Sequence, residues 1–246
     1  ALGDMGEVRM QIGLLADSEG DTESLEKAIA GLEDFEVKNA FFLGDLTRYG
    51  SIEELSEIKD ILDSSSVEFL AIPGDHDLAE SVEAGDSEGR ENFKEVFGKT
   101  MYIYEDRDYK FMLFDNSANF TKISEEDMEW FEENVKDVDF VILSQPLYHP
   151  SNQRVMGKFE GDVVSTVRYQ AEQMLSAIRD SRVKAVIAAD QHFFSVNSDP
   201  EKEDLAHIVV GALISNKNSL RNPQSSRYAI LKIYEKGDYV VDEVVL

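Results

Sequence analysis

The feature of this sequence that most constrains its fold is an alternation of short apolar runs with segments of helical periodicity. Three apolar runs have the length and composition of buried strands, at Val8–Ala16, Asn39–Leu43 and Val67–Ile72. Two stretches between them repeat apolar residues at helical spacing, and Thr22 is placed to cap the first of these helices. This order predicts parallel strands with helices packed on the faces of the sheet.

The rest of the chain continues the pattern and adds antiparallel strands. Met101–Glu105 and Tyr109–Asp115 alternate around a short polar turn, which predicts a hairpin. Further helices and strands are expected at Ile123–Val135 (capped by Ser124), Thr166–Arg179, Val138–Leu143, Val183–Ala189, His207–Leu213, Tyr228–Tyr234 and Tyr239–Val245. We expect the last three strands to form an antiparallel finish. Two mixed sheets covered by helices account for this order, and the sequence shows no repeat or linker that would divide residues 1–246 into more than one domain.

A long segment between two of these elements, Ser144–Ser165, has no clear helical or strand pattern. Loops of this length in compact domains are usually functional or mobile. A tolerated surface insertion is an equally open interpretation. The segment therefore marks a place to look for function without assigning one.

Composition excludes several classes of protein. The chain has 50 acidic and 24 basic residues and a net charge of −26, which argues against general binding to nucleic acid or anionic membranes. Its hydrophobic content of 42% excludes a disordered chain, and no apolar run approaches the roughly 18 residues of a membrane span. Cysteine is absent, so a metal ion would have to be held by oxygen and imidazole ligands.

Two features bear on the compartment. The acidity is compatible with the well-solvated surface of an exported or salt-adapted protein. The chain begins with Ala1 rather than Met, which fits an exported chain whose signal was removed and equally a trimmed cytoplasmic chain. The compartment and the oligomeric state therefore stay open at this point.

Acidic and histidine side chains follow most of the predicted strands. The residues at the strand ends are Asp17-Ser18-Glu19, Gly44-Asp45, Gly74-Asp75-His76-Asp77, Ser144-Gln145-Pro146 and Asp190-Gln191-His192. Ligands of such sheets gather at the carboxyl ends of the strands. A single Asp at a strand end is more often a turn former than a ligand. The inference of a ligand site therefore rests on the whole set of strand ends and not on any one residue. A polyvalent cation is the simplest reason to gather carboxylates that would otherwise repel one another.

In the order of these motifs the chain resembles the calcineurin-like metallophosphoesterases. That family's signature runs Asp-x-His, Gly-Asp, Gly-Asn-His-Asp/Glu, a His two residues before Pro, and Gly-His-x-His. The resemblance covers nearly the whole chain. It implies an α/β fold, a four-layer α/β/β/α sandwich of two mixed β-sheets flanked by helices. It also implies a two-metal site that hydrolyses phosphate esters, and hence a small phosphorylated substrate.

The resemblance implies a role for each matching residue. Asp17 matches the first metal ligand, Asp45 the Asp that bridges both metals, and His192 the last His. His76 and Asp77 match the catalytic His, which stabilises or protonates the leaving oxygen, and the acid that orients it.

The chain departs from the family pattern at four ligand positions. Glu19 and Asp190 replace histidines, Asp75 replaces Asn, and Ser144 stands as a weak ligand in place of a His. The ligand set then carries five carboxylates, Asp45 among them, where the family has about two, so two divalent cations no longer exceed the ligands in charge. Less positive charge weakens the Lewis acid and repels a phosphate dianion, which favours a phosphodiester substrate. A set rich in oxygen favours Mn²⁺, Mg²⁺ or Ca²⁺ over Zn²⁺, and a trivalent iron would restore charge.

Other side chains could reach the same site. Arg48 and Tyr49 follow Asp45 directly, and His149, Arg154 and Arg168 belong to the long loop or the helix after it. Arginine is suited to clamp a phosphate with two parallel hydrogen bonds. Each arginine could equally form a surface ion pair in an acidic chain, and a loop histidine could simply face solvent.

Two functions remain open on the sequence. The first is metal-dependent hydrolysis of a phosphate ester, motivated by Asp17, Asp45, His76, Asp77 and His192 in the family order. The second is a catalytically weakened or inactive homologue that acts as a cation-binding or structural module. It is motivated by the loss of family histidines at Glu19, Ser144 and Asp190.

Overall fold

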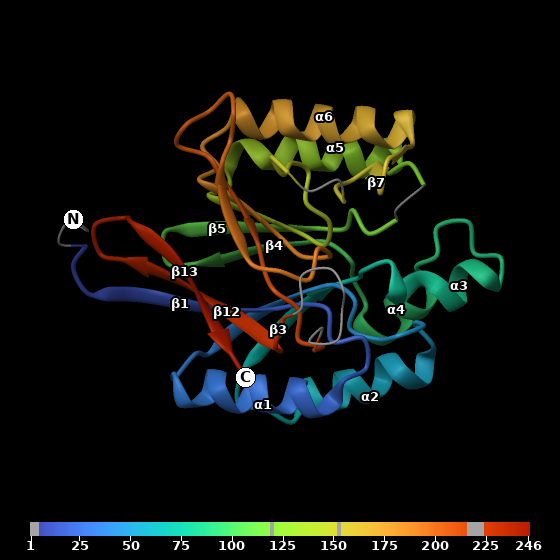
Figure 1. Cartoon of the computed structure of the whole chain (residues 1–246), viewed down its shortest axis with the longest axis horizontal. Coiled ribbons are helices and arrows are strands. Elements are labelled where there is room, and N and C mark those ends of the chain that lie inside the picture. The colour runs from blue at the N-terminus through green and yellow to red at the C-terminus, as the bar shows by residue number, and fades with distance from the viewer. Residues whose placement is uncertain (1–4, 119–120, 152–153, 216–223) are drawn as a thin grey trace.

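The computed structural model describes residues 5–118, 121–151, 154–215 and 224–246. Two large β-sheets lie face to face, and each carries helices on its outer face (Figure 1). Helices α1 (Thr22–Asp34) and α2 (Ile52–Asp63) cover one sheet, and α5 (Glu125–Asn134) and α6 (Ser165–Arg179) cover the other. The result is a four-layer α/β/β/α sandwich of two mixed sheets, which confirms the predicted fold class.

The first sheet has five strands in the order β13-β12-β1-β2-β3. Strands β1, β2 and β3 are parallel, whereas β12 and β13 are antiparallel to their neighbours. The bounds are β1 Val8–Leu15, β2 Asn39–Leu43, β3 Glu68–Ile72, β12 Arg227–Tyr234 and β13 Tyr239–Val245. The carboxyl ends of β1, β2 and β3 therefore meet at one edge of this sheet.

The second sheet has six strands in the order β10-β11-β9-β6-β5-β4. Its four central strands are parallel and its two edge strands are antiparallel. The bounds are β4 Tyr102–Asp106, β5 Tyr109–Phe114, β6 Phe140–Leu143, β9 Ala185–Ala188, β10 Ser195–Ser198 and β11 Ala206–Val209. A short hairpin of β7 (Lys158–Phe159) and β8 (Asp162–Val163) lies apart from both sheets.

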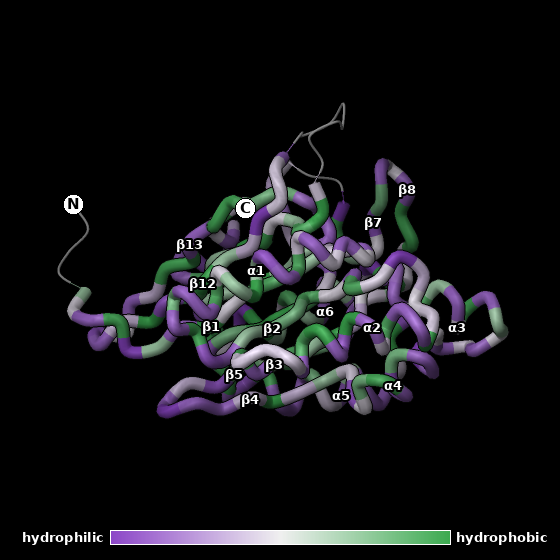
Figure 2. The backbone as a smooth tube through the Cα atoms, turned by 90° about the horizontal axis from the view of Figure 1, so that it is seen from below, coloured by the Kyte–Doolittle hydropathy of each residue, from purple (hydrophilic) through white to green (hydrophobic). Residues whose placement is uncertain are grey.

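Buried apolar side chains fill each interface between layers. One cluster lies between the two sheets, and its aromatic centre is Phe41, Phe111 and Phe140. A second cluster packs α5 and α6 on their sheet, and a third packs α1 and α2 on theirs. Hydrophobic stretches accordingly run along the inner strands such as β2 (Figure 2). Within the described ranges, no helix combines the length and apolarity that crossing a membrane requires.

Most of the predicted elements are confirmed to within a few residues, and some details are wrong. Asp21, not Thr22, caps α1, because its carboxylate accepts the backbone N–H of Ser24. The expected antiparallel finish holds for β12 and β13 only, since β11 lies in the other sheet, parallel to β9. The polar strand β10 was not predicted.

Three short helices also went unpredicted, because none carries a long enough periodic pattern. They are η1 (His76–Leu78), α3 (Ala79–Glu83) and α4 (Glu91–Phe97). The segment expected to lack structure, 144–165, contains the β7–β8 hairpin. A further single turn, η2 (Val135–Asp137), follows α5.

The aromatic centre between the sheets should dominate stability. Phe111 is fully buried, stacks on Phe140 at 5.2 Å and meets Phe41 edge-on at 5.5 Å. We expect Phe111→Ala to lower the free energy of unfolding by about 3–5 kcal/mol, measured by urea denaturation. Val196→Ala, on an exposed strand position, should stay within about 0.5 kcal/mol. Equal effects of the two substitutions would contradict the assignment of this core.

Candidate metal centre and active site

The carboxyl ends of parallel strands from both sheets converge on one small region. Asp17 follows β1, Asp45 follows β2, and Asp190 follows β9 of the other sheet. The Asp190 backbone N–H donates to Asp17 Oδ2 at 3.3 Å, so the two sheets contact each other through these residues. The buried aspartates Asp17, Asp45 and Asp190 are 1%, 2% and 5% exposed.

Unfavourable backbone conformations concentrate at these strand ends. Asp17, Glu19, Asp45, Asp190 and His192 all have positive φ, between 45° and 68°. Side chains other than glycine rarely adopt this region, and residues held there cost of order 1 kcal/mol or more each. Backbone strain of this kind persists where the surrounding structure enforces it and is concentrated at functional sites.

Two glycines let the loops after β2 and β3 cross closely. A Cβ added to Gly44 would lie 2.8 Å from Gly74 Cα, and Gly44 has φ of 93°. A Cβ added to Gly74 would collide with the carboxylate and backbone nitrogen of Asp45. The backbone of the β3 loop therefore packs directly against Asp45, and His76 N–H donates to Asp45 Oδ1 at 3.0 Å.

The side chains form three groups that could each hold a metal ion. Their potential ligand atoms lie within 4.8 Å of one another in Asp17–Asp45–His192, Glu19–Asp45–His76 and Asp45–Asp75–Asp190. Asp45 belongs to all three groups, which is the position of a bridging ligand. The structure thus brings together seven sequence-predicted residues from four loops: Asp17, Glu19, Asp45, Asp75, His76, Asp190 and His192.

Clustering raises the pKa values of the carboxyls. Burial, then the charges of Asp190 and Glu19, raise the pKa of Asp17 well above its ordinary value. Burial, then the charges of Asp75 and Asp17, do the same to the pKa of Asp45. The pKa of Asp75 is raised first by burial and then by Asp190. Keeping these groups ionised near neutral pH therefore costs free energy that a bound cation would offset.

His192 completes the first group as a neutral imidazole. Its Nε2 lies 3.4 Å from Glu19 Oε1 and 3.9 Å from Asp17 Oδ1. Burial lowers its pKa despite the opposing charge of Glu19. A neutral imidazole next to carboxylates is a donor set for a divalent ion, and its oxygen content suits Mn²⁺, Mg²⁺ or Ca²⁺.

Asp77 joins the loops rather than contacting His76. Its carboxylate accepts hydrogen bonds from Leu46 N–H, Thr47 N–H, the Thr47 hydroxyl and Gly74 N–H at 2.8–3.1 Å. Asp77 is fully buried, and burial raises its pKa to about 6 against these hydrogen bonds. Asp77 therefore ties the loop after β2, which carries Asp45, to the loop after β3, which carries His76.

The ring of His76 is instead held by a backbone carbonyl. Its Nδ1 lies 3.0 Å from the Arg48 carbonyl oxygen. A carbonyl can only accept, so Nδ1 carries a proton and Nε2 is the nitrogen that acts as ligand, acceptor or acid. His76 is half-buried beside Asp45 and Glu19.

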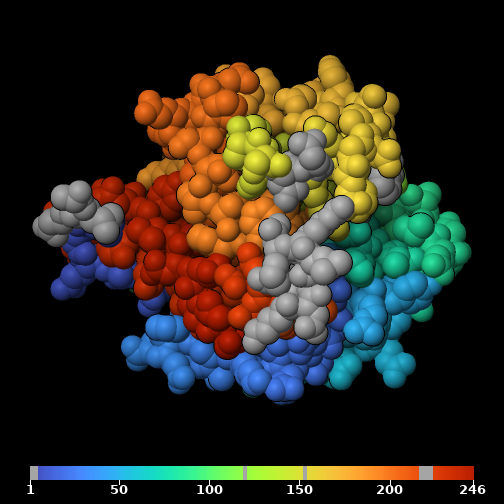
Figure 3. All heavy atoms as spheres, viewed as in Figure 1, coloured from blue at the N-terminus to red at the C-terminus, as the bar shows by residue number. Residues whose placement is uncertain are grey.

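Arg154 reaches the carboxylates from the long loop. Its Nε and Nη2 donate to the two oxygens of Asp190 at 2.7 and 2.8 Å, which is a bidentate ion pair. The face in Figure 3 shows the yellow segment around β7 bordering the turquoise segment of α3 and α4. Arg168 contributes structurally, since it donates to the Leu147 and Met156 carbonyls and pairs with Glu172.

The remaining predicted residues lie outside the three groups. Ser144 lines the same pocket as Asp45 and Asp190, but its N–H and hydroxyl both donate to Asn116 Oδ1. The Tyr49 hydroxyl donates to Glu83, and the Arg48 side chain is exposed. His149 packs edge-on against Phe193 at 5.6 Å, and burial lowers its pKa.

Two residues that organise the site were not singled out from the sequence. Asn116, at the end of β5, holds Ser144 and donates to the Gln145 carbonyl at 2.9 Å. Gln191 donates to the Arg154 carbonyl at 2.7 Å. Both Asn116 and Gln191 lie just after a buried strand, and a polar residue at that position is the sequence signal that could have identified them.

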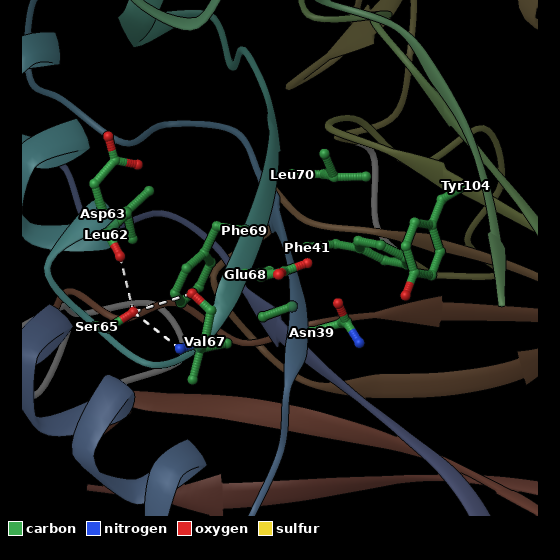
Figure 4. Close-up of a pocket in the computed structure, with 11 residues that line it drawn as sticks. Asn39, Phe41, Leu62, Asp63, Ser65, Val67, Glu68, Phe69, Leu70 and Tyr104 are labelled. Atoms are coloured by element: carbon green, nitrogen blue, oxygen red, sulfur yellow. Dashed lines mark hydrogen bonds between the residues drawn. The ribbon is translucent and has the colours of Figure 1, made fainter.

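A larger cavity lies away from this cluster. It has a volume of about 380 Å³ and opens between β3 and β4, with Phe41, Leu70 and Tyr104 on its wall (Figure 4). Of its acidic residues, Asp63 pairs with Lys59 and Glu68 is exposed. It gathers no set of metal ligands among the described residues. The candidate metal ligands therefore lie at the strand ends and not in this larger cavity.

Comparisons with known proteins bear on the family and the fold of this chain. A family model for calcineurin-like phosphoesterases matches residues 1–194. Among solved structures, the chain is similar to a dimetal phosphatase from Danio rerio, at 16% identity over 96% of both chains with a TM-score of 0.68. It is also similar to GAP50, the anchor in the inner membrane complex of Plasmodium, at 16% identity over 97% of this chain and 85% of that chain, with a TM-score of 0.67.

A third similar structure is the purple acid phosphatase PPD1 from yellow lupin, at 12% identity over 98% of this chain and 52% of that chain, with a TM-score of 0.69. A search of curated protein sequences gave no match. At such identities the structural likeness shows the fold, and the family model shows the family.

The close approach of the two loops at Gly44 and Gly74 offers a direct test of the site geometry. Gly74→Ala should displace Asp45, abolish stabilisation by added Mn²⁺ and cost about 2–4 kcal/mol of stability. The measurement is thermal and urea unfolding with and without Mn²⁺. Gly98→Ala is the control, because a Cβ there meets nothing within 4 Å, so that any loss of stability comes from the positive φ of Gly98 and not from a collision. If Gly74→Ala kept the full Mn²⁺ response, the packing of the β3 loop on Asp45 would be wrong.

The raised carboxyl pKa values predict how stability depends on pH. A carboxyl whose folded pKa lies above its unfolded value stabilises the fold most below about pH 4, and this contribution is lost as pH rises through the folded pKa. For Asp77 that window runs from 3.8 to about 6, and the pKa values of Asp17 and Asp45 are shifted in the same direction. Chelator-treated protein should therefore lose stability between pH 4 and 7.

Two comparisons isolate this effect from the overall charge. Asp45→Asn should flatten the decline, because it removes one repelling carboxyl, and millimolar Mn²⁺ should reverse it in the unsubstituted protein. Urea unfolding across the pH range measures both. Identical pH profiles for the two proteins in chelator would count against mutual repulsion at the site.

Proposed function

This chain belongs to the calcineurin-like phosphoesterase family, and we propose that it hydrolyses a phosphate ester with divalent metal ions held by the carboxylate-rich site. The observation that carries the proposal is that three potential ligand groups share Asp45. A bridging carboxylate between two ion positions is what a two-metal hydrolase needs. We also propose that residues 1–246 act as one unit, because strand ends of both sheets build the site.

The donor set fits divalent ions with a preference for oxygen. Asp17, Asp45 and His192 would hold the first ion with help from Glu19, and Asp45, Asp75 and Asp190 surround the second position. Mn²⁺, Mg²⁺ or Ca²⁺ suits these ligands better than Zn²⁺, and iron remains compatible. An ion bound there would polarise the phosphoryl oxygen and acidify a water.

The chain's own residues supply the proton transfer and the positioning. The Arg48 carbonyl engages the Nδ1 proton of His76, which leaves Nε2 for the substrate, and in the imidazolium form Nε2 carries a second proton that it can donate to the leaving oxygen. Asp77 acts as a positioning residue, because it fixes the loop of His76 against the loop of Asp45 through four hydrogen bonds. Both roles need the crossing at Gly44 and Gly74.

The charge of the site favours a phosphodiester over a phosphomonoester. Five carboxylates line the region: Asp17, Glu19, Asp45, Asp75 and Asp190. A monoanionic diester meets less repulsion there than a monoester dianion does. The net charge of −26 likewise disfavours polyanionic nucleic acid as a general ligand and favours a small phosphorylated substrate. Arg48, Tyr49 and His149 remain candidates for substrate contacts at the rim.

A second candidate function is a catalytically weakened homologue that binds a cation and serves a structural role. Two observations favour it. Ser144 stands where the family has a metal-binding His, and Asn116 engages its hydroxyl. Arg154 is paired with Asp190. Tight ion binding without hydrolysis would select this function.

Hydrolysis assays test the proposal. Generic diester and monoester substrates are assayed with Mn²⁺, Mg²⁺, Ca²⁺ or iron, and we expect metal-dependent turnover with diesters preferred. Asp45→Asn and His76→Ala should each lower kcat/KM by about 100-fold or more. Asp63→Asn, a surface carboxylate paired with Lys59, should leave the rate unchanged. No turnover above buffer with any ion, and no effect of Asp45→Asn, would contradict an enzymatic role.

A further inference from the structure

The second ion position contains a positive charge supplied by the protein itself. Arg154 forms a bidentate ion pair with Asp190, a member of the Asp45–Asp75–Asp190 group. Its Nε and Nη2 donate to the two carboxylate oxygens at 2.7 and 2.8 Å. Bidentate arginine–carboxylate pairs are the strongest and most directional of the protein ion pairs. The Asp190 side chain is 6% exposed and the Arg154 side chain 32% exposed, so solvent screens the pair from the arginine side only.

The guanidinium is the counter-ion of the whole second group and not of Asp190 alone. Burial by itself would lower the pKa of Arg154, but hydrogen bonding to Asp190 and the charges of Asp190, Asp75 and Asp45 raise it. These three aspartates are the members of the second group. The charge of Arg154 in turn lowers the pKa of Asp75 against the effects of burial and Asp190.

Several contacts hold the arginine in place. The Arg154 carbonyl accepts a hydrogen bond from the Gln191 side chain, next to Asp190 in the chain. Its guanidinium lies 4.9 Å from the ring centre of Phe159 in β7, a cation–π contact. Val155, the next residue, bridges back to Lys158 at the start of β7. Arg154 thus reaches the carboxylates from a position just before the β7–β8 hairpin.

We infer that Arg154 is an internal cation that takes the place of the second metal ion, so that the resting protein binds one divalent ion and not two. Arg154 hydrogen-bonds to Asp190 of the second group, whereas its charge acts on Asp17 of the first group as a weaker Coulombic effect, so the Asp17–Asp45–His192 group remains the position of the resident ion. At the second position a divalent ion would have to displace the fork from Asp190 and approach a guanidinium. Both requirements weaken its binding.

This inference rests on the proposed function and changes it in one respect: one metal ion and one arginine, in place of two metal ions, occupy the two positions that share Asp45. A guanidinium can neutralise carboxylates and bind a phosphoryl oxygen, but it is not a Lewis acid that acidifies water. The reaction would therefore depend on a single ion next to Asp45.

Metal stoichiometry tests the inference without an activity assay. The unsubstituted protein, Arg154→Met and Arg154→Lys are dialysed against Mn²⁺ and analysed for bound metal and for melting temperature. We expect one tightly bound Mn²⁺ per chain in the unsubstituted protein and two in Arg154→Met, with the second Kd tightened at least about tenfold. Arg154→Lys keeps the charge and should remain at one ion.

A matched control separates this effect from the general loss of a buried ion pair. Arg179 forms a bidentate ion pair with Asp199 at 3.0 and 3.0 Å, and neither residue belongs to the candidate metal groups. Arg179→Met should lower the melting temperature and leave the stoichiometry at one ion. Two tight ions in the unsubstituted protein, or one ion in both it and Arg154→Met, would overturn the inference while leaving the proposed function standing. No bound ion in any variant would overturn both.

Discussion

The mutual repulsion of buried carboxylates at the strand ends is the constraint on which this structure depends. Asp17, Asp45 and Asp190 come from two different sheets and are almost completely buried. Burial and neighbouring negative charge both raise the pKa values of Asp17 and Asp45. A fold maintains such an arrangement only if other groups offset its cost. We propose that a divalent ion and the guanidinium of Arg154 are the offsetting groups here.

The backbone is shaped around the same constraint. Positive φ angles recur at Asp17, Glu19, Asp45, Asp190 and His192, and the two loop glycines allow two backbones to cross beside Asp45. None of these features is needed to pack the apolar layers, which are filled by side chains elsewhere on the strands. The fold therefore provides a rigid scaffold, and the strained loops at one edge adapt it to binding and chemistry.

The layers were predictable from sequence, whereas the connections between loops were not. Val8–Ala16, Asn39–Leu43 and Val67–Ile72 predict strands because parallel strands buried on both faces read as continuous apolar runs. Gly44-Asp45 and Gly74-Asp75 predict the site because a glycine lets the chain turn at the end of a strand.

The fork of Arg154 on Asp190, the anchoring of Ser144 by Asn116, and the backbone hydrogen bonds of Asp77 depend on loops that meet only in the folded chain. Local sequence patterns carry no information about which loops meet.

Anomalous diffraction from a crystal grown with Mn²⁺ tests most directly the claim that a bound cation offsets the repulsion between these carboxylates. The account predicts a manganese peak within about 2.5 Å of oxygens of Asp17 and Asp45 and of a His192 nitrogen. A well-ordered site with no peak there at millimolar Mn²⁺ would contradict it.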